Sequence, residues 1–320
     1  GSRYGTLNNC TLSGNSADAG GGSYDSTLNN CALSGNSATY GGGSYDGTLT
    51  NCTLSGNSAY SGGGSYDGML NNCIVYYNTA AVSGPNYEKS TLNYSCTTPD
   101  PGGANNITNE PNLASASHLA LGSPCIGAGN SAYASGSDID GEPWLNPPSM
   151  GCDEVVAGSI TGALSVSAWT AYTNVSIGFP VQFQAYISGR VTASTWQWTD
   201  GSVSSNQPYA IHAFPSNGVY LVILTAYNES YPLGVAATVT VQVATQMVCY
   251  VNIENTTPSP PFSSWATAAT NIQDAVDAAS QVGALVLVSN GVYATGGRVV
   301  CWAMTNRVAI TQAITVQSVN

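Results

Sequence analysis

Cysteine is the residue type in this chain whose spacing could indicate chemistry. Nine cysteines are present, and four of them recur every 21 residues: Cys10, Cys31, Cys52 and Cys73. A zinc site needs thiolates or imidazoles that converge on one ion, whereas these cysteines are copies of one repeat position without a nearby histidine. Disulfides between in-register parallel strands would be awkward in geometry. The pattern favours a small buried residue that stacks on its own copies.

Carboxylates are the second group with possible chemistry. Asp138, Asp140 and Glu142 form a tight acidic run that could hold calcium, which is the one cofactor that the sequence suggests. The run lacks the full spacing of a known calcium loop. The alternative is a turn whose aspartate side chains cap backbone amides.

Catalysis would need more than these acidic residues. Glycoside hydrolysis uses two carboxylates in different roles, but Asp25, Asp46 and Asp67 are copies of one repeat position. A polysaccharide lyase needs a basic residue beside its calcium, and neither Arg3 nor Lys89 lies in a repeated strand next to an aspartate cluster. No Ser-His-Asp or phosphate-loop arrangement appears. We therefore predict that the chain is not an enzyme.

Tyrosine forms a third recurring feature, because Tyr24, Tyr45 and Tyr66 each precede an aspartate. Stacked at the same position of successive repeats, they would form an exposed stripe. Aromatic stripes can contact sugars, so the stripe is a candidate carbohydrate surface. The alternative is a solvated face of stacked rings.

These residues need a repeating scaffold to align them, and the sequence has one. The 21-residue period is too short for helical-pair repeats and fits one coil of a β-solenoid. The phrase Leu-x-x-Cys-x-Leu has the alternation of a strand, and Gly-Asn and Gly triplets supply corners. Identical residues then stack in ladders. We expect asparagine ladders to chain amide hydrogen bonds: Asn9, Asn30, Asn51 and Asn72, and Asn15, Asn36 and Asn57.

The repeat is followed by a stretch that resembles the closing segment of secreted choice-of-anchor β-helix proteins. Residues 123–129 read Ser-Pro-Cys-Ile-Gly-Ala-Gly, and residues 138–143 read Asp-Ile-Asp-Gly-Glu-Pro. Residues 150–154 read Met-Gly-Cys-Asp-Glu. Gly127, Trp144 and Cys152 stand where that family usually has Asp, Arg and Ala. The resemblance implies that residues 1–157 are the C-terminal part of a right-handed parallel β-helix.

From residue 158 to 246 the pattern changes to short alternating strands, which predicts a β-sandwich. The run Trp-Gln-Trp-Thr-Asp-Gly at residues 196–201, with His212-Ala-Phe and Gly218-Val-Tyr, resembles the PKD type of immunoglobulin-like domain. Gln197 and Thr199 depart from that family's pattern. The resemblance implies a spacer or adhesion module.

Residues 247–320 resemble the opening of a pectate-lyase-like β-helix. A short capping helix is predicted near residues 271–279, where Ile272, Ala275, Val276 and Ala279 would share one face. The first strands of a second β-helix would follow. The remaining cysteines suggest two disulfides, Cys125–Cys152 and Cys249–Cys301.

Composition limits the partners. The net charge is −12 and charged residues make up only 7% of the chain, which disfavours nucleic acid and anionic membrane surfaces. No apolar run of about 18 residues would insert into a membrane. With so few charges, the chain must owe its solubility to uncharged polar residues. Such a surface suits a protein outside the cell, so we expect an extracellular or cell-surface location.

The order of the parts predicts a function. The chain opens like the end of a β-helix and finishes like the start of one, so we expect one period of a tandem array or surface fibre. Copies of the chain, joined head to tail, would complete a β-helix across each junction. The alternatives are a carbohydrate-binding or adhesion module, with polysaccharide as partner, and, less favoured, a polysaccharide lyase.

Overall fold

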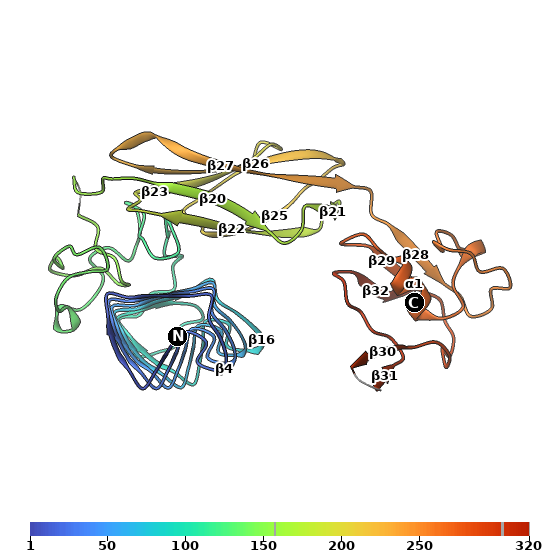
Figure 1. The fold of residues 1–320 in the computed structure, drawn as a ribbon, viewed down its shortest axis with the longest axis horizontal. Helices are drawn as coiled ribbons and strands as arrows, with labels where there is room; N and C mark the ends of the chain where they lie inside the picture. The colour runs from blue at the N-terminus through green and yellow to red at the C-terminus, as the bar shows by residue number, and fades with distance from the viewer. Residues whose placement is uncertain (157, 302–303, 320) are drawn as a thin grey trace.

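The computed structural model describes residues 1–156, 158–301 and 304–319. Figure 1 shows a solenoid at the N-terminal end, a sandwich above it, and a smaller module at the C-terminal end. Nearly all regular elements are strands, and the described residues contain one α-helix. The predicted all-β class, with solenoid, sandwich and one short helix, is confirmed. No helix among the described residues has the length and apolar character to span a bilayer.

The solenoid (residues 1–97) consists of four stacks of parallel strands. The first stack holds β1 (Ser2–Arg3), β5 (Ser23–Tyr24), β9 (Ser44–Tyr45), β13 (Ser65–Tyr66) and β17 (Tyr87–Glu88). The second holds β2 (Thr6–Asn8), β6 (Thr27–Asn29), β10 (Thr48–Thr50), β14 (Met69–Asn71) and β18 (Thr91–Asn93). The third holds β3 (Thr11–Ser13), β7 (Ala32–Ser34), β11 (Thr53–Ser55), β15 (Ile74–Tyr76) and β19 (Cys96–Thr97). The fourth holds β4 (Ser16–Ala19), β8 (Ser37–Tyr40), β12 (Ser58–Ser61) and β16 (Thr79–Ser83).

The 21-residue period sets the register of these stacks. Leu28 pairs with Leu49, and Leu49 with Leu70, so each leucine lies on its own copy. All three are fully buried. The corners need left-handed backbone, and asparagine provides it at Asn30 (φ 54°) and Asn51 (φ 48°), because its short polar side chain tolerates that region. The stacked parallel solenoid is therefore the direct product of the repeat.

A closing segment (residues 98–156) covers one flank of the solenoid with little regular structure beyond a 3-10 turn at η1 (Ser131–Tyr133). Its apolar side chains share a buried cluster with the last rungs, formed by Ile74, Cys96, Leu113, Leu119, Cys125 and Met150. Backbone bridges such as Leu113 to Leu119 hold its turns. The segment therefore covers the solenoid side wall.

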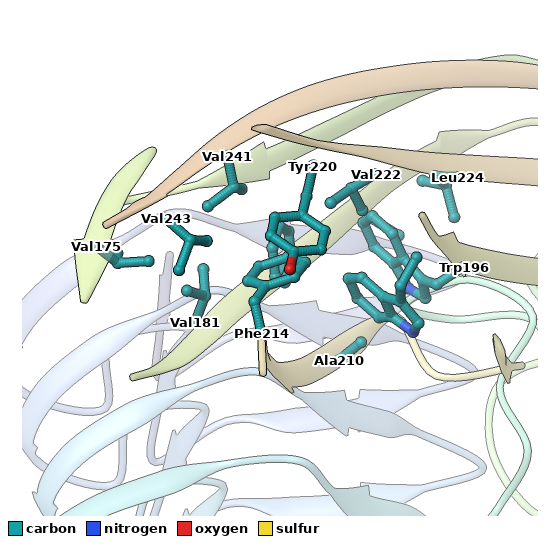
Figure 2. Packing of buried hydrophobic residues seen from close by; sticks show 13 residues of the cluster. Val175, Val181, Trp196, Ala210, Phe214, Tyr220, Val222, Leu224, Val241 and Val243 are labelled. Carbon is teal, nitrogen blue, oxygen red and sulfur yellow. The ribbon is translucent and has the colours of Figure 1, made fainter. Parts of the chain in front are cut away.

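The sandwich packs two sheets face to face. One sheet holds β20 (Ser165–Thr170), β22 (Pro180–Ser188) and β25 (Tyr209–Ala213), in that order. The other holds β21 (Asn174–Ser176), β27 (Tyr231–Ala244), β26 (Gly218–Asn228), β23 (Ala193–Trp198) and β24 (Val203–Ser205). Figure 2 shows Trp196, Phe214 and Tyr220 in the core between them. The Trp196 indole N–H donates to the Gln207 carbonyl at 2.9 Å, so the buried ring leaves no polar atom unpaired.

The C-terminal module contains a parallel sheet of β28 (Val248–Val251), β29 (Leu285–Val288) and β32 (Thr315–Ser318). A 3-10 turn, η2 (Trp265–Thr267), the helix α1 (Ile272–Ala278) and the hairpin of β30 (Arg298–Cys301) and β31 (Met304–Asn306) complete it. Asn271 caps the helix by accepting from the Asp274 N–H at 2.9 Å. Ala275 and Val276 are buried as predicted. Gln273 is also buried, because its amide bonds to the backbone of Ala309.

Candidate functional site

The cysteine ladder lies inside the solenoid. Cys31, Cys52 and Cys73 are fully buried, whereas Cys10, in the first rung, is half-buried. Each thiol donates to the carbonyl two residues earlier, as Cys52 does to Thr50 at 3.2 Å. Burial raises the pKa of the Cys52 thiol well above its usual value, because the thiolate would be desolvated. These residues are stacked copies whose thiols bond to the backbone.

The predicted asparagine ladders form, and one of them has a second role. The Asn51 side-chain amide donates to Asn30 Oδ1 at 3.1 Å and to the Tyr133 carbonyl at 3.0 Å. Asn72 repeats this pattern with Asn51 and Asn130. The Asn9, Asn30, Asn51 and Asn72 ladder therefore holds the closing segment against the solenoid corner. Sequence reasoning did not foresee this second set of acceptors.

The second ladder is buried in the solenoid. Asn36 donates to Asn57 Oδ1, and Asn57 donates to Asn78 Oδ1, both at 2.9 Å. Asn86 then accepts from Asn78 at 3.2 Å. Asn78 stands one period after Asn57, so the period itself could have extended the ladder to it. Asn86 follows Asn78 by only eight residues. The 21-residue period therefore could not predict that Asn86 joins the ladder.

The tyrosine stripe has a geometry unsuited to sugar stacking. Tyr24, Tyr45 and Tyr66 lie parallel to one another, with ring centroids 5.2 and 5.4 Å apart. Arg3 lies over the outer ring at one end and Lys89 over the ring at the other. The ring faces, which would pack against a sugar, are therefore covered by neighbours. The geometry corresponds to the alternative, a solvated face of stacked rings.

The candidate calcium residues are engaged by groups of the protein itself. Asp138 Oδ1 accepts from the N–H groups of Asp140 (3.0 Å) and Glu142 (2.7 Å), and its Oδ2 accepts from the Glu154 N–H at 3.0 Å. Asp140 and Glu142 both pair with the Arg190 guanidinium. A guanidinium therefore stands where the cation would have to bind. The residues present do not fit a calcium site, and the capped turn is the arrangement observed.

A cluster that sequence reasoning missed lies beside this turn, where the closing segment meets the sandwich. His118 Nε2 lies 3.1 Å from Asp140 Oδ2, and its Nδ1 contacts the Ser115 hydroxyl at 2.7 Å. Ligand atoms of His118, Asp140 and Asp153 lie within 4.8 Å of one another. Asp153 also accepts from the Leu119 N–H at 2.8 Å. The sequence analysis had named Asp140 as a candidate calcium ligand, but it did not place His118 or Asp153 beside it.

Proton affinities in this cluster depart from ordinary values. Burial raises the pKa of Asp153 to about 7. Burial lowers the pKa of His118, but the Asp140 hydrogen bond and the negative charges of Asp153 and Asp140 outweigh it and leave that pKa above its usual value. The pKa of Asp140 lies below its usual value, because His118 and Arg190 outweigh the effect of burial. The cluster is thus a contact between charged groups in which Asp153 changes its protonation near neutral pH.

The predicted Cys125–Cys152 disulfide does not form, since both residues are free buried thiols. Cys125 packs against Cys96 in the last rungs of the solenoid, whereas the Cys152 N–H donates to the Thr53 hydroxyl at 3.1 Å and its thiol to the Ser117 carbonyl. Each sulfur therefore points into a different environment. Cys249 is also a free thiol in β28. The side chain of Cys301 lies outside the described residues, so the Cys249–Cys301 disulfide stays a prediction.

The ends of the parallel stacks form a further candidate site. β1, β2, β3 and β4 each occupy the end of a stack. A hollow of about 540 Å³ opens at this end, between residues 1–3 and 15–21 and Tyr24. In the C-terminal module, β32 is the outer strand of its sheet. Both ends could receive a further parallel strand.

Comparison with known proteins bears on the sandwich. Residues 164–243 match the family model of the PKD domain. No curated protein matches the chain. A β-solenoid joined to a PKD domain fits an extracellular or adhesion-type module.

Proposed function

We propose that this chain is an extracellular structural module whose solenoid is extended, at the edge of its first rung, by the C-terminal module of another copy. The copy can be a separate molecule or the next period of the same polypeptide. Repetition of this contact generates a surface fibre, because a head-to-tail contact does not close on itself. The PKD domain then acts as the spacer between successive β-helical segments.

The pattern of inter-rung hydrogen bonds carries this proposal. Three N–H groups of the second rung donate to carbonyls of the first at 2.8 to 3.0 Å: Thr27 to Gly5, Ala32 to Cys10, and Ser37 to Asn15. By the same repeat, the N–H groups one period earlier point away from the solenoid, and these belong to Thr6, Thr11 and Ser16. They form a row of donors that an incoming parallel strand can satisfy.

The side chains of β2 and β3, in the middle of this edge, do little to prevent such pairing, whereas β1 and β4 carry Arg3 and Asp18. Natural edge strands are commonly blunted by charge, proline or a bulge, but β2 and β3 contain neither charge nor proline. Strand β32 contains Thr315, Val316 and Gln317 and is equally uncharged. Its pairing with β29 is parallel, the same sense as in the solenoid. The part of the edge formed by β2 and β3 is therefore compatible with β32 in direction and polarity.

We also propose that the module has no catalytic activity. The nearest approach to a catalytic cluster in the described part of the chain is His118, Asp140 and Asp153. The hollow beside them is about 10 Å³, which is roughly the space of one water molecule and far below that of a sugar ring. Incubation with soluble polysaccharides and calcium is expected to release no new reducing or unsaturated ends. Sustained release would overturn this part of the proposal.

Assembly is tested by sedimentation velocity and negative-stain electron microscopy over a range of protein concentrations. The wild-type chain is expected to form filaments or concentration-dependent oligomers. The double variant Thr6→Pro/Thr11→Pro removes two edge donors and no hydrogen bond within the chain, so it is expected to stay monomeric. The matched control, Thr6→Val/Thr11→Val, keeps both N–H groups and is expected to assemble. A wild type that is monodisperse at high concentration and forms no filaments contradicts the proposal.

A further inference from the structure

The outer face of the β20-β22-β25 sheet carries an aromatic and amide surface that faces the solenoid. Strand pairing places Trp169 opposite Gln184 and Gln184 opposite Tyr209, so these three side chains form one row across the sheet. The neighbouring rows on the same face contain Tyr186 and Ile211, because side chains alternate along a strand. Trp169 is 52% exposed and Tyr186 is 50% exposed. Large rings on this face are thus left uncovered by the rest of the chain.

The solenoid forms the opposite wall, and Tyr209 crosses the space between. Its hydroxyl donates to the Ser55 carbonyl at 3.3 Å, and its ring lies against Gly56. A hollow of about 370 Å³ opens on one side, lined by Trp169, Gln182 and, from the solenoid, Tyr77. A hollow of about 510 Å³ opens on the other side. Gln184 and Tyr209 line both, so the two hollows form one groove divided by a pillar.

The chemistry of the groove is neutral throughout. Neither hollow has a charged side chain in its lining. The smaller hollow combines aromatic rings with the side-chain amides of Gln182 and Gln184. The larger is rich in serine hydroxyls and contains the Tyr186 ring. Amides and hydroxyls both donate and accept hydrogen bonds, and an aromatic face attracts the polarised C–H groups on the flat side of a sugar ring.

We propose that this groove binds a neutral oligosaccharide, with one sugar ring packed on Trp169 and the amide of Gln184 bonded to its hydroxyls. Each hollow falls within the range of about 300–1,000 Å³ that is typical of ligand pockets. An anionic ligand would find no cation in the lining, and a basic peptide would find no carboxylate. This site is separate from the tyrosine stripe, whose ring faces are covered. It goes beyond the assembly role and is independent of it.

Native gel electrophoresis through gels that contain soluble polysaccharide tests the site on the full chain. The probes are mannan, hydroxyethylcellulose and dextran as neutral chains, with polygalacturonate as the anionic chain. At least one neutral probe is expected to retard the wild type, and polygalacturonate is not. Trp169→Ala is expected to weaken binding at least tenfold. Trp265→Ala is the matched control: this tryptophan is 42% exposed and lies outside the groove, so its loss should change binding less than twofold.

Three outcomes of the binding assay overturn the proposal. They are no retardation by any neutral probe, equal retardation of Trp169→Ala and the wild type, and loss of binding in Tyr45→Ala with retention in Trp169→Ala, which would assign the sugar to the stripe. Concentration-dependent self-association that Trp169→Ala abolishes would assign the groove to a second copy of the chain instead. The single variant Thr6→Pro changes the edge of the first rung at a residue that lines neither hollow, so it should bind sugar normally. Failure of the assembly proposal and failure of this one are therefore distinguishable.

Discussion

The ring of Tyr209 lies directly on Gly56, in the one copy of the Ser-Gly-Asn corner that the sandwich covers. A Cβ at Gly56 would overlap the tyrosine ring, whereas one at Gly14 would meet nothing within 4 Å. All of these corner glycines have left-handed backbone, with φ of 66° at Gly14 and 63° at Gly56. The Ser-Gly-Asn corner turns the chain in every repeat of the solenoid. In this one repeat it also contacts the sandwich.

Gly56→Ala should weaken the contact between solenoid and sandwich. The added methyl group must displace Tyr209 and break its bond to Ser55, so limited proteolysis should cut the linker near residue 158 faster than in the wild type. Gly35→Ala is the matched control, since Gly35 has the same φ and only a distant backbone neighbour. Both variants should lose about 1 kcal/mol for placing alanine in the left-handed region. Equal proteolysis rates in the two variants would show that the contact does not hold the domains together.

Asn57→Ala should destabilise the solenoid by about 3 kcal/mol, measured by urea unfolding. The Asn57 side chain donates to Leu33 and Asn78 and accepts twice from Asn36. Its removal leaves several buried polar groups without partners, and each costs about 1–3 kcal/mol. Asn15→Ala removes the equivalent side chain from the half-buried first rung and should cost about 1 kcal/mol or less. If both variants lose a similar free energy of unfolding, burial of the ladder does not determine how much its asparagines stabilise the solenoid.

The repeat allowed the solenoid to be predicted because periodicity encodes register. Once Leu28 is known to recur as Leu49, parallel in-register stacking brings every copied residue onto its neighbour. Helix α1 was equally accessible, since its apolar face and its Asn271 cap are local. The match to a PKD domain rested on the short runs around Trp196 and Tyr220. Each of these inferences used information within a few residues or at a fixed spacing.

The contacts between parts could not be predicted in this way. Tyr209 meets Gly56, and Arg190 meets Asp140, across long and aperiodic separations in sequence. Nothing in the local sequence indicates either contact. A tyrosine is common in a strand and an aspartate is common in a turn, so neither residue looks unusual where it stands. The Cys125–Cys152 disulfide was wrong for a related reason. Residue type and an assumed oxidising location do not determine which way two thiols point.

Thiol labelling should distinguish the first rung from those behind it. In the native chain at pH 8, iodoacetamide should modify Cys10 at least ten times faster than Cys31, Cys52 or Cys73, because reaction needs an accessible thiolate. Peptide mass mapping reads each site separately. If copies stack on the first rung, filaments should protect Cys10 as well. Rapid labelling of Cys52 in the folded chain would show that the ladder opens, which would contradict a rigid solenoid.

The cluster at the junction should make stability depend on pH. The native pKa of Asp153, about 7, lies above its unfolded value of 3.8, so between these values the native state holds a proton that the unfolded state has lost. The pKa of His118 is likewise raised above 6.5. Both groups therefore favour folding at the acid end of this window and lose that contribution as pH rises through their native pKa values. The free energy of unfolding should fall between pH 5 and pH 8.

Asp153→Asn isolates this effect. The amide oxygen can still accept from the Leu119 N–H, but the side chain no longer titrates, so the variant should be more stable than the wild type at pH 8 and show a smaller change from pH 5. The wild-type slope from Asp153 is at most roughly 1.4 kcal/mol per pH unit. Asp18→Asn, which changes an exposed carboxylate in β4, should leave the slope unaltered. Urea unfolding at pH 5, 6, 7 and 8 measures all three proteins. If Asp153→Asn keeps the wild-type slope, Asp153 does not hold a proton in the native state near neutral pH.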